Sequence, residues 1–121
     1  MKKLIGLVFT SLLLVGCASS TQYQWGGYED DLYAGYKDPQ KMTALRTNLE
    51  KQISTLESKQ LKVAPGLYAE LGTLYLQAGL TEQAIAMYKK ERDLWPESKG
   101  LMSAMIQNLE RKQLEKNEAK K

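Results

Sequence analysis

The sequence predicts an all-α fold organised around a hairpin of two amphipathic helices, and three observations support this. Apolar residues recur every three or four positions in several stretches, which is the spacing of one helical face. Glycine and proline punctuate these stretches where helices would stop or start. No two stretches alternate apolar and polar residues as paired strands would. The 121 residues suit one small domain with a modest core.

The chain begins with a leader that has the order of a secretory signal peptide. Lys2 and Lys3 precede an apolar run from Leu4 to Val15, which is too short to span a bilayer as a helix. We therefore predict that residues 1–16 are a signal peptide that is removed.

The run Leu14-Val15-Gly16-Cys17 resembles the lipobox of bacterial lipoproteins. In that class a diacylglyceryl group alkylates the cysteine thiol and the peptide is cut just before it, here between Gly16 and Cys17. The alternative is a secretory signal with an incidental or buried thiol. The position of the only cysteine at the end of the apolar run favours the lipobox.

The lipobox resemblance also implies a location. Ala18 stands where an aspartate tends to keep enteric-type lipoproteins on the inner membrane, so the implied destination is the outer membrane, facing the periplasm. Two or three acyl chains would hold the protein there, since each buried CH₂ contributes about 0.8 kcal/mol. Residues 17–22 would then be a small, polar, lipidated tether.

The charge of the chain gives no indication of a nucleic-acid partner. Of the 17 lysines and arginines, Lys2 and Lys3 lie in the leader, which leaves 15 against 14 acidic residues in the mature chain. A nearly neutral periplasmic protein is not expected to bind nucleic acid, and we predict no small-molecule substrate.

Residues 23–37 form a segment rich in aromatic side chains, which are rarely left in water. They are Tyr23, Trp25, Tyr28, Tyr33 and Tyr36. Tyr28, Tyr33 and Tyr36 fit one face of a short helix together with Leu32. The segment either packs back on the helices as a lid, which we favour for Trp25 and Tyr28, or forms a partner-docking surface. For the other tyrosines the two interpretations are balanced.

A helical domain is predicted over residues 38–110. Asp38-Pro39 is a strong helix start, and the helix that follows is expected to reach about Gln60. Its apolar stripe is Met42, Leu45, Leu49, Ile53 and Leu56. A last helix after Pro96 has the apolar face Leu101, Met102, Met105, Ile106 and Leu109. The charged tail at 111–121 is expected to fray.

Residues 65–98 predict the helical hairpin itself. Gly79 is expected to end the first helix, because glycine adopts the left-handed conformation that closes a helix. Thr81 is expected to cap the second helix, which ends at Trp95-Pro96.

This hairpin resembles a tetratricopeptide repeat of about 34 residues. The positions of the repeat pattern are held by Tyr68, Leu71-Gly72, Tyr75, Ala84, Tyr88 and Pro96. Gly72 and Ala84 are small where the two helices would cross closely. Glu91 departs from the pattern, which has a small residue there, so we expect this side of the second helix to be looser, or polar and exposed.

Tetratricopeptide-like hairpins usually bind peptides on the concave face of the first helix. The resemblance places Gly66, Ala69, Thr73, Leu76 and Gln77 on that face. These residues are small or neutral, so a charged chain end is not the expected ligand. Either a hydrophobic or extended partner segment uses the face, or the protein's own N-terminal aromatics or first helix fill it. We favour self-filling, because one repeat needs capping elements.

Several segments together resemble a family of small bacterial lipoproteins of unknown function. They are the lipobox, the run from Tyr23 to Tyr33, Asp38-Pro39, the run from Pro65 to Glu70, Glu91, and the run from Leu94 to Ser98. Members are often encoded beside lipoproteins similar to the curli secretion channel, which implies a role in envelope or secretion-related assembly. The resemblance supplies no catalytic residue.

The residues that carry most enzymatic chemistry are missing from the sequence. Histidine is absent and the only cysteine lies in the lipobox, which disfavours the usual zinc sites and histidine-assisted nucleophiles. Glu29, Asp30 and Asp31 are adjacent, so on a helix their side chains diverge, and a solvated acidic patch is favoured over a calcium site or an acid-base pair.

We therefore expect no enzyme, no metal and no cofactor beyond the covalent lipid on Cys17. The leading hypothesis is an adaptor that binds other envelope lipoproteins. The alternatives are a structural envelope component that binds peptidoglycan or lipid, and a small hydrolase that uses carboxylates.

Overall fold

The computed structural model describes residue 23 and residues 27–121, except for the side chains of Glu29, Tyr36 and Pro39. The predicted signal peptide, Cys17, the tether and Trp25 lie outside the described residues. The described residues form helices and no strand, which confirms the all-α prediction. In chain order the elements are α2 (Tyr28–Lys37), the 3-10 turn η1 (Pro39–Lys41), α3 (Met42–Ser58), α4 (Leu67–Gln77), α5 (Thr81–Leu94), the 3-10 turn η2 (Pro96–Ser98) and α6 (Lys99–Glu118).

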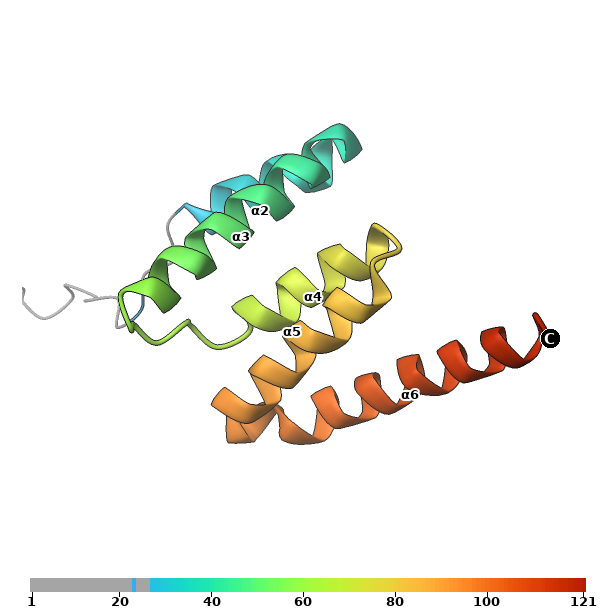
Figure 1. Ribbon diagram of the computed structural model, residues 1–121. Helices are drawn as coiled ribbons and strands as arrows, with labels where there is room; N and C mark the ends of the chain where they lie inside the picture. Colours follow the sequence, from blue (N-terminus) through green and yellow to red (C-terminus); the bar gives the residue numbers. More distant parts are fainter. Residues whose placement is uncertain (1–22, 24–26) are drawn as a thin grey trace, which may run out of the picture.

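Each helix packs mainly against the next helix in the chain, from α2 on α3 to α5 on α6. Figure 1 shows the α4–α5 hairpin at the centre, with α2 and α3 on one side and α6 on the other. The loop at residues 59–66 lies at the same end of the molecule as the junction between α5 and α6, and the C-terminus lies at the other end. The molecule therefore has two distinct ends.

The turn between α4 and α5 is a Schellman motif, which satisfies the last carbonyls of a helix. Gly79 has a φ of 77°, and its N–H donates to the Leu76 carbonyl at 3.0 Å. The Leu80 N–H donates to the Tyr75 carbonyl at 2.9 Å. Gly79 thus ends α4 as predicted. The predicted cap at Thr81 is wrong, because the motif makes Leu80 the N-cap and Thr81 the first helical residue, with no side-chain cap bond.

The start of α3 also differs slightly from its prediction. The Asp38 carboxylate does accept a bond from a nearby backbone, the Gln40 N–H, at 3.0 Å. This bond begins the 3-10 turn η1, and the α-helix follows from Met42. Asp38 thus caps the 3-10 turn, whereas the α-helix begins one turn later than expected, with Lys41 as its N-cap.

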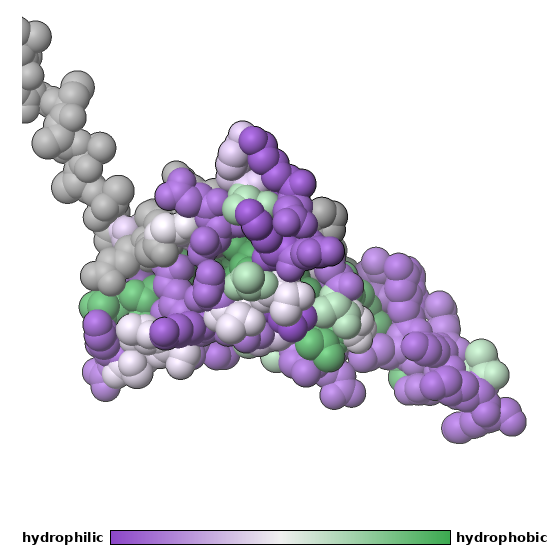
Figure 2. Space-filling model, turned by 90° about the horizontal axis from the view of Figure 1, so that it is seen from above, coloured by the Kyte–Doolittle hydropathy of each residue, from purple (hydrophilic) through white to green (hydrophobic). Residues whose placement is uncertain are grey.

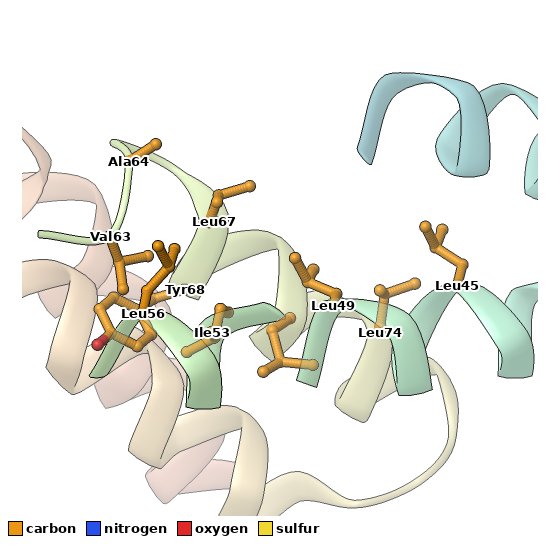
Figure 3. Packing of buried hydrophobic residues seen from close by; sticks show 10 residues of the cluster. Leu45, Leu49, Ile53, Leu56, Val63, Ala64, Leu67, Tyr68 and Leu74 are labelled. Carbon is orange, nitrogen blue, oxygen red and sulfur yellow. The ribbon is translucent and has the colours of Figure 1, made fainter. Parts of the chain in front are cut away.

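Two hydrophobic clusters hold the helices together. The first lies between α3, the following loop and α4 (Figure 3), and consists of Leu45, Leu49, Ile53, Leu56, Val63, Ala64, Leu67, Tyr68, Leu71 and Leu74. The second joins α5 to α6 and consists of Ala84, Ile85, Tyr88, Met102, Ile106 and Leu109. Burial of one leucine or isoleucine side chain contributes about 1.5–3 kcal/mol. The α4–α5 hairpin is thus covered by apolar contacts on both sides.

Gly72 lets α4 approach α5 closely, as its small size predicts. A Cβ at this position would lie 2.7 Å from Cε1 of Tyr88 and 3.2 Å from the Ala84 carbonyl oxygen. Tyr88 and Ala84 are fully buried. A fully buried ring such as that of Tyr88 has little room to move. The close approach of α4 to α5 therefore depends on the absence of a side chain at residue 72.

The last helix differs from its prediction in two ways. Leu101 is 65% exposed, whereas the other predicted residues, Met102, Met105, Ile106 and Leu109, pack in or against the second cluster. The predicted fraying of the tail is also not what the structure shows, since α6 continues to Glu118. Good helix formers fill this part, and Arg111 pairs with Glu115 at 3.9 Å. Neither α6 nor another described helix combines the length and the apolar character needed to cross a bilayer.

Replacing Gly72 by alanine is expected to destabilise the protein by about 1–3 kcal/mol, because the new methyl group collides with the Tyr88 ring. Gly100→Ala is the matched control, since nothing lies within 4 Å of a Cβ there. In α6 this change is expected to be neutral or to stabilise by up to about 1 kcal/mol. Urea denaturation followed by circular dichroism measures both. An equal increase in the free energy of unfolding for the two variants would contradict the close approach of α4 and α5 at Gly72.

Candidate binding site

The predicted aromatic residues do not gather on one surface. Tyr28 is half-buried and packs on the first cluster, whereas Tyr33 is 63% exposed, with the Lys37 ammonium 4.4 Å from its ring centroid. Tyr23, like Tyr28, packs on the first cluster, and its ring also contacts Trp95. The side chain of Tyr36 and all of Trp25 lie outside the description. The expected common face of Tyr28 and Tyr33 is therefore wrong.

The residues predicted for the concave face of α4 mostly contact the chain itself. Ala69 and Leu76 pack on the second cluster, and the Thr73 hydroxyl bonds the Tyr88 hydroxyl at 3.0 Å. Gln77 is exposed beside a small hollow formed with α3. Ala69, Thr73 and Leu76 thus contact α5 and α6, whereas the sequence predicts that the first helix or the N-terminal aromatics fill this face.

The carboxyl group of Glu91 is buried at the open end of the hairpin, opposite the turn at Gly79. Glu91 as a whole is only 1% exposed. Oε1 accepts the Gly66 N–H at 2.8 Å and the Ser98 hydroxyl at 3.2 Å. The expectation of a loose or exposed polar side is therefore wrong. The reason is that the side chain turns inward to bond the backbone N–H at the start of α4, which has no partner within that helix.

Two polar atoms beside this bond have no described partner. Oε2 of Glu91 and Nε1 of Trp95 are both buried and make no hydrogen bond among the described residues. Each such atom costs about 1–3 kcal/mol relative to a satisfied one. The end of the hairpin thus concentrates buried polar groups, two of which have no hydrogen bond among the described residues.

Trp95 is enclosed by an aromatic and a cationic side chain. The Tyr23 ring meets it edge-on, with centroids 5.7 Å apart and an interplanar angle of 87°. The Lys62 ammonium lies 4.0 Å from the Trp95 ring centroid. Such contacts are worth about 0.5–2 kcal/mol each. Tyr23 therefore connects the N-terminal segment to the end of α5.

A second polar group lies around Tyr68, near the start of α4. Oε1 of Glu57 accepts bonds from the Tyr68 hydroxyl and the Lys90 ammonium, both at 2.7 Å. The hydrogen bond from Lys90 lowers the pKa of the Glu57 carboxyl, although partial burial opposes it, and the bond from Tyr68 lowers it further. Burial, followed by the bond to Glu57, raises the pKa of the Tyr68 hydroxyl. We call the Glu91, Trp95 and Glu57 groups together the polar end.

The polar end is assembled from separate segments of the chain. Tyr23, the run from Gly66 to Tyr68, and the run from Glu91 to Ser98 all contribute to it. Residues 22–105 match a family model described as a domain of unknown function (DUF4810), which covers more than half of the chain. The chain belongs to the DUF4810 family. No curated protein and no solved structure matches it.

The DUF4810 match includes the whole polar end but stops within α6. A groove of about 740 Å³ lies between the α4–α5 turn, which is inside the match, and the last part of α6, which is beyond it. Leu76, Leu80 and Leu109 supply apolar surface to this groove. Among the residues that line the groove, only Leu76 is predicted from the sequence to bind a partner. The four-residue spacing of Lys112, Lys116 and Lys120 is the signal in the sequence that points to the others.

The Glu91 bonds should contribute strongly to stability. Glu91→Ala removes the acceptor of two hydrogen bonds and leaves a void, so the free energy of unfolding should fall by about 2–4 kcal/mol. Ser98→Ala removes only the longer bond and should cost about 1 kcal/mol. Glu97→Ala is the control at an exposed position and should stay within about 0.5 kcal/mol of the parent. Urea denaturation measures all three, and a neutral Glu91→Ala would contradict this account.

The stability should depend on pH through Glu57. Its pKa is lowered on folding, so it stabilises the folded state above its unfolded pKa near 4.5 and stops doing so as the pH falls through the folded pKa. Glu57→Gln should therefore cost more stability at about pH 7 than at about pH 3. The effect is modest because the side chain is 39% exposed. Denaturation at both pH values tests this, and an equal cost at the two would contradict it.

Proposed function

We propose that the protein is a lipid-anchored outer-membrane lipoprotein that faces the periplasm and acts as a non-catalytic adaptor between envelope proteins. The anchor is supported by the run Leu14-Val15-Gly16-Cys17 after a short apolar stretch. The periplasmic side of the outer membrane is supported by Ala18 after the cysteine. The absence of histidine and the commitment of the only cysteine to lipid support a binding role over catalysis.

The contact between Tyr23 and Trp95 is the observation that carries this proposal. Tyr23 follows Cys17 by six residues, and an extended chain covers at most about 3.6 Å per residue. A lipid on Cys17 would therefore hold Tyr23 within about 22 Å of the membrane surface. Trp95 packs directly on Tyr23 and would be held near the membrane with it. The polar end would face the membrane, while the α4–α5 turn and the end of α6 would point into the periplasm. A body oriented in this way presents its far end to other proteins.

The helical body supports the adaptor role through its kind of architecture. The close crossing at Gly72 and Ala84 is the packing expected of a tetratricopeptide-like hairpin, with α6 as the flanking helix. Such hairpins work by presenting helical surfaces to partners. Members of the small lipoprotein family that the sequence resembles are often encoded beside lipoproteins similar to the curli secretion channel. An assembly with such envelope lipoproteins would use a helical surface of this kind.

Both lipidation and partner binding should require Cys17. Photocrosslinking in whole cells, followed by mass spectrometry, should recover a specific envelope lipoprotein with the parent protein. Cys17→Ser should abolish processing, move the protein out of the outer-membrane fraction and remove that crosslink. Ser19→Ala, in the tether, is the control and should change nothing.

Other outcomes distinguish the alternatives. Unchanged maturation and fractionation of Cys17→Ser would overturn the anchor. Retention of the protein on purified peptidoglycan sacculi, without a protein crosslink, would favour a structural component that binds the cell wall.

A further inference from the structure

The second half of α6 is a helix without a packing partner in the described chain. The last residue of α6 that is buried is Leu109, and after it only Gln113 is half-buried, although the helix continues to Glu118. Leu114 is 63% exposed. Figure 2 shows hydrophilic residues covering the part of the molecule that extends toward the C-terminus. A helical segment of this length is marginally stable alone, so a bound partner would stabilise it.

One face of this half is basic and lines the groove. Lys112 and Lys116 lie four residues, or about 6 Å, apart along one side of α6. Lys120 follows at the same spacing in the turn just after the helix ends, and all three line the groove. The apolar surface of Leu76, Leu80 and Leu109 lies in the same groove. The groove therefore combines a row of positive charges with a hydrophobic surface.

The three lysines form no ion pair within the part of the chain that the structure describes. Lys89 and Lys90 pair with Glu110 and Glu57, but no carboxyl group in the described part of the chain forms an ion pair with Lys112, Lys116 or Lys120. Glu82 is the one described acidic residue that lines the groove. The net positive charge of the groove favours an occupant that carries several negative charges.

We propose that this groove binds an acidic amphipathic helix of a partner protein. Carboxylates spaced four residues apart on the partner would match the lysine spacing, and its apolar face would cover Leu76, Leu80 and Leu109. This inference rests on the proposed adaptor function and names the chemistry of the partner.

The position of the groove favours a protein over a membrane lipid. Leu80 and Trp95 lie at opposite ends of α5, whose 14 residues span about 20 Å. Since Tyr23 contacts Trp95, the groove lies at the end away from the anchored segment. A lipid headgroup of the same membrane would have to reach past the whole hairpin.

Binding of a defined probe tests the chemistry. The full-length protein in detergent is titrated with a fluorescent helical peptide that has glutamate at every fourth position and leucines on one face. The same peptide with lysine at those positions is the probe control. The acidic peptide should bind, and the triple change Lys112→Gln, Lys116→Gln and Lys120→Gln should weaken it about tenfold, since exposed ion pairs contribute up to about 1 kcal/mol each.

A matched variant controls for net charge. Lys51→Gln, Lys59→Gln and Lys99→Gln remove the same charge from exposed positions outside the groove and should leave affinity within about twofold. Far-ultraviolet circular dichroism checks that α6 stays helical in both. Equal loss with both triple variants, or equal binding of the lysine peptide, would overturn the proposal.

Crosslinking in cells separates this inference from the adaptor function. A photoreactive residue at Gln113 should crosslink an acidic segment of another protein, and the groove variant should abolish that crosslink. Crosslinks only from a control position at Lys51 would overturn the groove and leave the adaptor function standing. Crosslinks to a second copy of this chain would show self-association and overturn the proposed partner. No protein crosslink from either position would overturn both proposals.

Discussion

The hydrogen bond between the Glu91 carboxyl and the Gly66 N–H closes the one end of the hairpin that the chain itself leaves open. At the other end, α4 and α5 are joined by the tight turn at Gly79, so they cannot separate there. At the open end nothing covalent holds them, and the loop before α4 and the turn after α5 lead away in different directions. Glu91 bonds the start of α4 and, through Ser98, the turn into α6. One buried carboxyl thus positions three elements.

A buried carboxyl is a costly way to join helices, since an apolar residue of similar size would often be as stable. What a carboxyl adds is direction, because its hydrogen bonds specify where the Gly66 N–H and the Ser98 hydroxyl must lie. The same end contains Trp95, against which the Tyr23 ring packs. A geometry fixed by hydrogen bonds therefore determines where the N-terminal segment leaves the body, and so how an anchored protein would stand on its membrane.

Local features of the fold were predictable from the sequence and long-range ones were not. Gly79, Asp38 and the small residues Gly72 and Ala84 act through neighbours in the same helix or hairpin, and the structure agrees with them. In the sequence, Glu91 stands out only as a departure from the repeat pattern, which has a small residue at this position. Its partner is a backbone N–H 25 residues away, and a backbone donor leaves no trace in the residue type. The exposure of Leu101 and Tyr33 likewise depends on which neighbour each helix meets.

The charged end of the chain shows why composition alone could not separate a frayed tail from a binding surface. Both are rich in lysine and glutamate, and only placement distinguishes them. In the structure Arg111 and Glu115 pair with each other, whereas the three lysines line the groove without a partner among the described residues. Leu109 is the last buried residue of α6, so it keeps the lysine row beside the α4–α5 turn. A frayed tail has no such anchor, and its charges would be free to turn toward water.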